Sequence, residues 1–252
     1  MSMIFTIASR EFKSLFLSPL AWTVLAILQC ILAYLFLTQV ETFTLIQPKL
    51  ATIEGAPGLT DIVVTPLYGN AGIILLLVTP LLTMRLICEE RRNKTLPLLL
   101  SAPISNADII IGKYLGLLGL LLLMILLITL MPLSLLMGGE LDIGKLAANL
   151  LALLLLVIAF TATGLFMSTI ARHPTVAAIG TFGILLLLWI LDWTTGMKDQ
   201  RSELFEYLSI LRHFQNLQSG LISSVDIIYF LLFTATFILL SIRSLDNERL
   251  QK

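Results

Sequence analysis

Long stretches without any charged residue dominate this chain. No charge occurs in residues 20–40, 62–84, 114–139 or 146–171. A helix that crosses a bilayer needs about 20 predominantly apolar residues, and each of these stretches is long enough. Charged residues make up only 13% of the chain, whereas a soluble domain has roughly 25%. The pattern therefore predicts an all-α integral membrane protein with no water-soluble catalytic domain.

Six transmembrane helices are expected, within a single domain that spans residues 1–252. They are placed at about residues 20–40, 67–88, 114–138, 147–171, 174–192 and 226–243. The last of them is short for a span, and a buried helix or a re-entrant segment is the alternative. Asp226 and Arg243 bracket it, and both side chains can lie at the membrane interface, which favours a span.

Six spans place both termini on one side of the membrane, and the distribution of Lys and Arg predicts which side that is. The side of the termini has eleven such residues, namely Arg10, Lys13, Arg85, Arg91, Arg92, Lys94, Lys113, Arg172, Arg243, Arg249 and Lys252. The opposite side has five, namely Lys49, Lys145, Lys198, Arg201 and Arg212. Because basic residues accumulate in cytoplasmic segments, both termini are expected in the cytoplasm and the protein in the inner (plasma) membrane.

Residue types that would support chemistry are missing from the expected spans. Their interiors contain no ionisable residue, which argues against an ion-coupled transporter with a charged site at the midplane. The chain has no Walker A, HExxH or GxSxG pattern and no Cys/His cluster. Its net charge is zero, so a nucleic-acid partner is not expected. No catalytic, cofactor-binding or metal-binding residue is therefore assigned, and membrane lipids are expected partners.

Residues 1–19 precede the first expected span. Apolar residues such as Ile7 and Phe12 alternate there with charged ones such as Arg10 and Lys13. This spacing predicts a short amphipathic helix that lies in the membrane interface. A loose polar segment leading into the first span is the alternative.

The segment between the second and third expected spans, residues 85–113, combines charges with an apolar patch. Its charged start predicts a wetted helix that continues the second span, with Glu90 and Lys94 paired at i,i+4. The apolar patch, Leu96–Leu100, is closed by Pro103. An apolar patch held outside the membrane indicates a partner surface. An ordinary hairpin whose leucines lie in the interface is the alternative.

The third span has recognisable signals at its start. Ser105 opens a sequence that resembles a capping box, so a helix is expected from near Asn106 into the membrane. Gly112, Gly116 and Gly119 follow at spacings of four and three, which place them on one helix face. Such a strip permits close approach of another helix and indicates helix packing.

Two substantial segments are expected on the outer side. Residues 41–66 contain three prolines and two glycines, which favours irregular structure. In residues 192–226, apolar residues recur every three or four positions and predict an amphipathic helix, or a broken pair, on or in the outer interface. These apolar residues are Phe205, Leu208, Leu211, Phe214, Leu217 and Leu221.

The segment between the second and third spans resembles the corresponding stretch of ABC-2 type transporter permeases. The family's pattern there is roughly E-R-x-x-G-T-L-E-x-L-L-x-x-P-[VI]-S, followed by G-K. The stretch that carries the resemblance, whose residues we call the matching residues, includes Glu90, Arg91, Arg92, Thr95, Leu96, Leu98, Leu99, Leu100, Pro103 and Ser105, with Arg92 and Leu98 at unspecified positions of the pattern. Lys94 replaces the family's glycine, and Pro97 its glutamate. Residues 172–175 and 244–249 also resemble the family, and residues 208–230 are similar to its gliding-motility and nitrous-oxide-reductase-maturation branch.

The resemblance implies the permease subunit of an ABC transporter, without catalysis of its own. It implies a pair of permease copies, as a homo- or heterodimer, each docked on a separate ABC ATPase. It also implies a short coupling helix between the second and third spans, and contact of the matching residues and the N-terminal helix with that ATPase. A structural or assembly protein that docks a non-ATPase partner is the alternative, and a secondary transporter is a further one.

Overall fold

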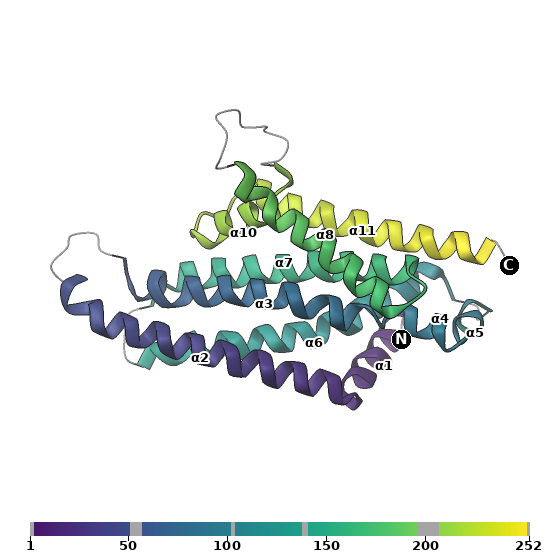
Figure 1. Ribbon diagram of the computed structural model, residues 1–252, viewed down its shortest axis with the longest axis horizontal. Coiled ribbons are helices and arrows are strands. Elements are labelled where there is room, and N and C mark those ends of the chain that lie inside the picture. Colours follow the sequence, from purple (N-terminus) through teal and green to yellow (C-terminus); the bar gives the residue numbers. More distant parts are fainter. Residues whose placement is uncertain (1–2, 51–56, 102–103, 138–140, 196–206, 251–252) are drawn as a thin grey trace.

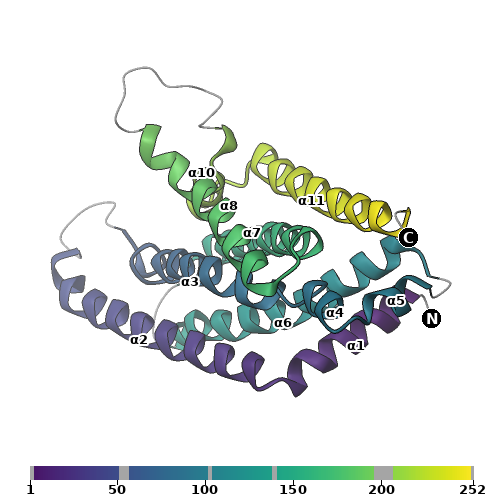
Figure 2. The same ribbon diagram turned by 45° about the vertical axis from the view of Figure 1, so that its right-hand side comes forward.

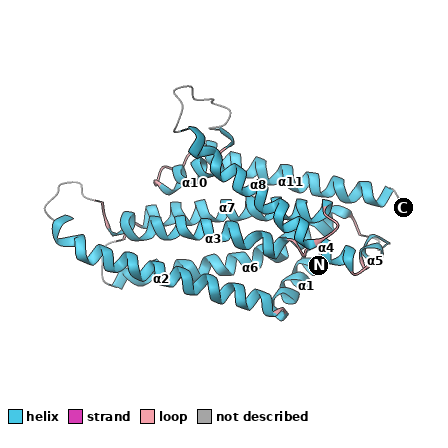
Figure 3. Cartoon of the chain, in the orientation of Figure 1, coloured by secondary structure: helices cyan, strands magenta, loops and turns pink. Residues whose placement is uncertain are grey.

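The structure is a computed structural model that describes residues 3–50, 57–101, 104–137, 141–195 and 207–250. Within these ranges the chain is helical and contains no strand (Figure 3). The helices are α1 (Met3–Leu17), α2 (Pro19–Leu50), η1 (Thr60–Val64), α3 (Thr65–Thr83), α4 (Cys88–Arg92), α5 (Leu96–Ser101), α6 (Asn106–Ser134), η2 (Leu135–Met137), α7 (Ile143–Ile170), α8 (Pro174–Thr195), α10 (Ile210–Gln218) and α11 (Ser224–Leu250).

Six helical segments in the described ranges are long and apolar enough to cross a membrane. They contain α2, α3, α6, α7, α8 and α11, and most of them run along the length of the molecule (Figure 1). The prediction of an all-α, multi-pass membrane protein with six spans is therefore confirmed. The last helix, α11, is 27 residues long, so the shortest of the expected spans has the length that a span needs.

The two ends of the bundle differ. Both termini lie at one end, together with α4 and α5, and we call this the terminal end (Figures 1 and 2). The first turns of α7 and the short helix α10 lie toward the opposite end (Figure 1). An even number of spans requires this arrangement, because the chain then returns to the side on which it began.

The central helix of the bundle is α7, which packs against α3, α6, α8, α10 and α11. Small residues on its buried faces let neighbouring helices approach closely. A Cβ atom added at Gly164 would lie only 2.1 Å from Oγ1 of Thr83 in α3. By contrast, α2, α8 and α11 leave apolar side chains such as Ile31, Ile179 and Leu232 exposed, which suits contact with lipid tails.

The expectation of irregular structure throughout residues 41–66 is wrong. The helix α2 continues to Leu50, and helical structure resumes at Thr60, where η1 runs directly into α3. Pro48 lies in the last turn of α2. Its missing N–H group interrupts little helical structure, because only two residues of α2 follow it. Pro66 lies in the first turn of α3, a position where proline is well tolerated.

The N-terminal segment forms the expected helix, α1, which packs against α6 and meets α2 at a sharp corner (Figure 2). The corner is fixed by the indole N–H of Trp22, which donates a 2.8 Å hydrogen bond to the carbonyl of Phe16. The rings of these two residues also meet edge to face, with centroids 5.6 Å apart. One face of α1 is therefore held by the bundle rather than left to lie free on the membrane.

Candidate functional site

Within the α4–α5 loop, residues 84–105, the expected continuation of the second span is present with a break: residues 84–87 form turns after α3, and helical structure then continues as α4 to Arg92. The N–H groups of Ile87 and Cys88 donate to the Ser168 hydroxyl of α7, at 3.0 and 3.2 Å. Because a side chain of another helix satisfies these groups, the hydrogen-bond ladder of α3 can end with the N–H of Met84, which donates to the carbonyl of Pro80, without leaving the N–H groups of Ile87 and Cys88 unpaired. The short helix α4 then begins afresh against the end of α7.

Lys94 has a left-handed backbone, with φ of 56°. This conformation is natural for glycine and costs other residues roughly 1–2 kcal/mol. A glycine, which the resembled family pattern has at this position, would adopt this backbone without that cost. The expected pairing of Glu90 with Lys94 is wrong, because α4 ends at Arg92 and the i,i+4 register is lost before Lys94. Glu90 pairs with Lys113 instead.

Lys113 joins three helices at the terminal end. Its ammonium lies 2.8 Å from Oε1 of Glu90 in α4 and 3.1 Å from Oε2 of Glu11 in α1. Lys113 itself, in α6, is only 4% exposed. A buried ammonium with two carboxylate partners is held firmly, because leaving any one charge unpaired is costly. The loop, α1 and α6 are thus connected at one point.

Arg91, the neighbour of Glu90, contacts a different set of helices. Its guanidinium donates to the carbonyls of Ala171 and Thr169 at the C-terminal end of α7, at 2.5 and 2.8 Å. It also donates to Oε2 of Glu248 in α11, at 2.6 Å. The last carbonyls of a helix have no partner within it, and an arginine near them is favourable. Adjacent residues of α4 therefore attach the loop to α1 and α6 on one hand, and to α7 and α11 on the other.

The start of α6 is tied in the same way. The Ser105 hydroxyl is the N-cap of α6 and accepts a 3.0 Å hydrogen bond from the N–H of Asp108. The first residue of the helix, Asn106, is 4% exposed and donates from Nδ2 to Oδ1 of Asp246 in α11, at 2.6 Å. We call residues 244–249, the polar stretch that resembles the family, the C-terminal tail. This tail is bonded on one side to Arg91 within the α4–α5 loop and on the other side to Asn106, which directly follows the loop.

The apolar patch of the loop is only partly available to a partner. Leu96 is 1% exposed and belongs to the chain's own core, so the expectation of an exposed patch is wrong for this residue. Leu99 is half-buried against that core. Thr95 and Pro97 are exposed, as is Arg92 at the end of α4. The side chains of Leu98 and Leu100, and the whole of Pro103, lie outside the described part of the chain.

A cleft of about 690 Å³ separates the α4–α5 loop from α1 and the start of α6. Leu99 and Thr95 of the loop, Glu11 of α1 and Lys113 of α6 are among the residues that line it. The lining residues come from α1, the loop and the start of α6, so the loop borders open space where it faces these two helices. This geometry lets a partner contact the loop without displacing the helices behind it.

The glycine strip of α6 faces α1. A Cβ atom at Gly112 would lie 2.7 Å from Cβ of Ile7, and one at Gly116 would lie 2.9 Å from the carbonyl oxygen of Ala8. One at Gly119 would lie 2.9 Å from the ring of Phe12. The three glycines thus allow α1 to approach the backbone of α6, which brings Glu11 within reach of Lys113.

The expected outer amphipathic helix is present as α10. Leu211, Phe214 and Leu217 are buried, and Phe214 packs against α3 at Gly72. Leu208 and Leu221, which the spacing placed on the same apolar face, are exposed. They lie outside the nine residues of α10, so the helical period does not reach them. Phe205 lies outside the described residues.

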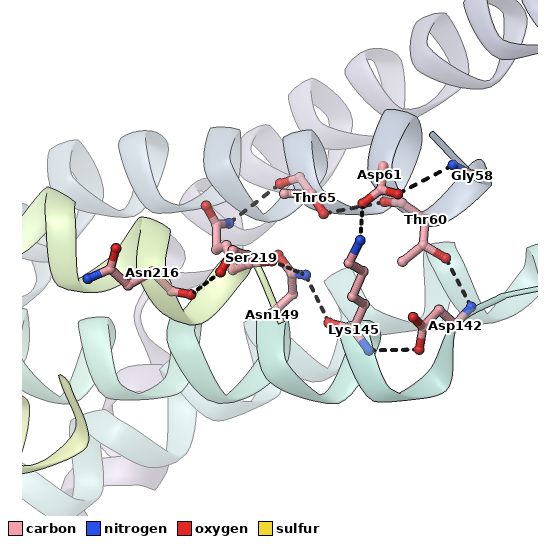
Figure 4. Close-up of polar contacts among 10 residues, drawn as sticks. Gly58, Thr60, Asp61, Thr65, Asp142, Lys145, Asn149, Asn216 and Ser219 are labelled. Carbon is pink, nitrogen blue, oxygen red and sulfur yellow. Dashed lines mark hydrogen bonds and ion pairs between the residues drawn. The ribbon is translucent and has the colours of Figure 1, made fainter. Parts of the chain in front are cut away.

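Polar contacts join both η1 and α10 to α7 (Figure 4). The Lys145 ammonium of α7 lies 2.6 Å from Oδ1 of Asp61 in η1. Asn149, fully buried in α7, donates to the carbonyls of Lys145 and Gln218, at 2.8 and 3.4 Å. Asp142, at the start of α7, donates from its N–H to the Thr60 hydroxyl at 3.0 Å. These groups lie far apart in the sequence, so no local sequence pattern predicts that they form a cluster.

A buried pair of His213 and Asp226 joins α10 to α11, and sequence reasoning missed it. Nδ1 of His213 lies 2.5 Å from Oδ1 of Asp226, and Nε2 lies 3.0 Å from the carbonyl of Tyr207. Because a carbonyl only accepts, Nε2 is the donor in the bond to Tyr207, and Nδ1 and Oδ1 are hydrogen-bonded to each other. The imidazole also stacks on Tyr229, with centroids 4.0 Å apart. The available signal was the position of His213 on the apolar face of α10, since a buried polar group needs a partner.

Comparison with known proteins agrees with this architecture. No match was found among curated proteins. A family model described as ABC-2 family transporter protein matches residues 5–250, which is nearly the entire chain. The match covers α1, the six spans, the α4–α5 loop and the C-terminal tail. The chain therefore belongs to the ABC-2 transporter family.

Proposed function

We propose that this protein is the membrane-spanning permease subunit of an ABC transporter, with ATP hydrolysed by a separate ATPase subunit. The family match over residues 5–250 supports a permease. The observation that carries the proposal is the attachment of the α4–α5 loop, through Glu90 and Arg91, to α1, α6, α7 and α11. A loop exposed at its tip and bonded to several spans is suited to receive movement from outside the membrane.

The ATPase contacts the α4–α5 loop in this proposal, with α5 as the coupling helix and α1 beside it. Exposed residues of the loop, such as Arg92 and Thr95, are the first to meet the partner, and Leu99 lines the cleft behind them. ATP-driven rearrangement of the ATPase shifts the loop and biases the spans between two arrangements. The permease supplies no catalytic group of its own.

The terminal end faces the cytoplasm of the cell, and the protein lies in the inner (plasma) membrane. The excess of Lys and Arg on the side of both termini, eleven against five, supports this orientation. An ATPase needs cytoplasmic ATP, so the α4–α5 loop must lie on that side. The resemblance of residues 208–230 to the gliding-motility and nitrous-oxide-reductase-maturation branch stays a prediction.

A second permease copy, identical or related, completes the transporter in this proposal. The exposed apolar faces of α2 and α8 offer surface for it and for lipid. The helix α8 leaves open space around Gly183, where an added Cβ atom would meet nothing within 4 Å. A pair of copies would give each ATPase its own α4–α5 loop.

Co-purification tests the proposal directly. Tagged protein is purified from its native membranes, and the expected result is an associated ATPase with a Walker A motif and measurable ATP turnover. Reversing the exposed charges of the loop, Arg92→Glu with Lys94→Glu, should release the ATPase, whereas Gln215→Glu on α10 should not. A stable non-ATPase partner on the loop, with no ATPase recovered, would instead show a structural or assembly protein.

A further inference from the structure

The last turns of α11 are fitted between the two sides of the α4–α5 loop. Leu245 is fully buried and anchors these turns in the core. At about 100° per residue, Asp246 and Glu248 flank Leu245 on its two sides. Asp246 accepts from Asn106 at the start of α6, and Glu248 accepts from Arg91 of α4, each at 2.6 Å. Arg91 lies within the loop and Asn106 directly follows it, so movement of the loop that carries Arg91 must either break the contact with Glu248 or displace the end of α11.

The other end of α11 is attached to α10. Asp226, in the first turn of α11, is 3% exposed and bonds to His213 of α10. The Tyr229 hydroxyl, one turn later, donates a 3.0 Å hydrogen bond to the carbonyl of Leu208, just before α10. The short helix α10 thus has side-chain bonds to the same helix whose far end is bonded to the loop.

The sequence between these two ends lacks the two residue types that most often kink a helix, proline and glycine. Residues 224–250 contain neither proline nor glycine, whereas α3 and α6 contain Pro80 and Pro132, and α7 and α8 contain glycine. Sharp bends in helices almost always occur at proline, at glycine or at a local bulge. A displacement applied to one end of α11 is therefore expected to reach its other end.

We propose that α11 is a stiff rod that transmits displacement of the α4–α5 loop to α10 at the opposite end of the bundle. Asp246 and Glu248 are the positioning residues that receive the displacement, and the His213–Asp226 pair passes it to α10. The inference rests on the proposed function, because the ATPase supplies the displacement. The proposal gives the C-terminal tail a role in transmission, which membership of the ABC-2 transporter family does not itself specify.

The test measures how accessible the first turn of α11 is to a thiol reagent while the ATPase at the terminal end hydrolyses ATP. The purified permease–ATPase complex, with Cys30→Ser and Cys88→Ala as background, receives one cysteine through Val225→Cys, at a residue that is 54% exposed. Its rate of modification by a maleimide is measured with and without ATP. We expect ATP to change this rate. An unchanged rate in a complex that hydrolyses ATP would overturn the proposal.

Tail variants then separate transmission from hydrolysis. Asp246→Ala with Glu248→Ala should abolish the ATP-dependent change at the reporter while the ATPase still co-purifies and hydrolyses ATP. Asn247→Ala, an exposed neighbour between the two, is the matched control and should keep the change. A double variant that retains the full ATP-dependent change would refute the proposal.

A swap variant guards against a merely structural effect. Exchanging the partners, Asn106→Asp with Asp246→Asn, reverses donor and acceptor but keeps the hydrogen bond, and it should restore the reporter response that Asp246→Ala weakens. If no ATPase co-purifies with the unaltered protein, the proposed function fails. If the ATPase is present and active but the tail variants have no effect, only the role of α11 fails.

Discussion

The Lys113 ammonium lies 2.8 Å from a carboxylate oxygen of Glu90, although the two residues are 23 positions apart in the sequence. The contact closes the α4–α5 loop onto the start of α6. Glu11 of α1 lies 3.1 Å from the same ammonium, so a single cation holds the loop and the N-terminal helix together. Removing that cation should loosen both at once.

Lys113→Ala is therefore expected to destabilise the protein markedly. Removing one partner of a buried ion pair costs about 3–5 kcal/mol, and we expect the lower end because Glu11 and Glu90 keep some access to solvent. Lys113→Arg should restore part of the loss. Thermal unfolding of the detergent-solubilised protein measures the effect, with Lys13→Ala, at an exposed position of α1, as control. Equal unfolding temperatures for both alanine variants would contradict the role of Lys113.

The glycine strip gives a second prediction. In Gly116→Ala, the new methyl group would lie 2.9 Å from the backbone oxygen of Ala8, which cannot rotate away, so α1 must shift. Overpacking of this kind costs about 1–3 kcal/mol. Gly183→Ala is the matched control, because nothing lies within 4 Å of that position. The unfolding temperature should fall for the first variant and stay constant or rise for the second, and the reverse order would exclude the packing of α1 on α6.

The sequence predicted the spans and the helix-packing glycines because these depend on local composition and spacing. The uncharged stretches required helices, and the spacing of Gly112, Gly116 and Gly119 required a close neighbour. The identity of that neighbour, α1, could not be predicted, because it depends on how helices distant in sequence pack. The same holds for Ser168, which ends α3 from another helix.

The loop shows where local rules mislead. The i,i+4 rule paired Glu90 with Lys94, but it assumes a continuous helix, and the chain leaves the helix before Lys94. The apolar run at Leu96 suggested an exposed patch, but burial in the chain's own core satisfies this leucine. The contacts of Arg91 with α7 and α11 join residues about 80 and 157 positions apart, beyond any local pattern.

The backbone of Lys94 gives a third prediction. Lys94→Gly should stabilise the protein slightly, because relief of roughly 1–2 kcal/mol of left-handed strain exceeds the added entropy cost of glycine, about 0.5–1 kcal/mol. Lys94→Val should be destabilising, since a β-branched residue tolerates this region poorly. Unfolding midpoints of the two variants, measured in the same detergent, should fall on either side of the unaltered protein. A glycine variant less stable than the valine variant would contradict the left-handed conformation.

The buried His213–Asp226 pair gives the last prediction. Asp226→Ala should cost about 1–3 kcal/mol, because it leaves Nδ1 of a 5% exposed imidazole without its partner. Replacing both residues by apolar ones, His213→Phe with Asp226→Leu, should cost less than the two single changes together, because no buried polar group is then left unpaired. Gln215→Ala, on the exposed face of α10, is the control and should leave the unfolding temperature unchanged. Strict additivity of the two single substitutions in a double-mutant cycle would show that His213 and Asp226 do not stabilise one another, and that α10 is held to the bundle by its apolar face alone.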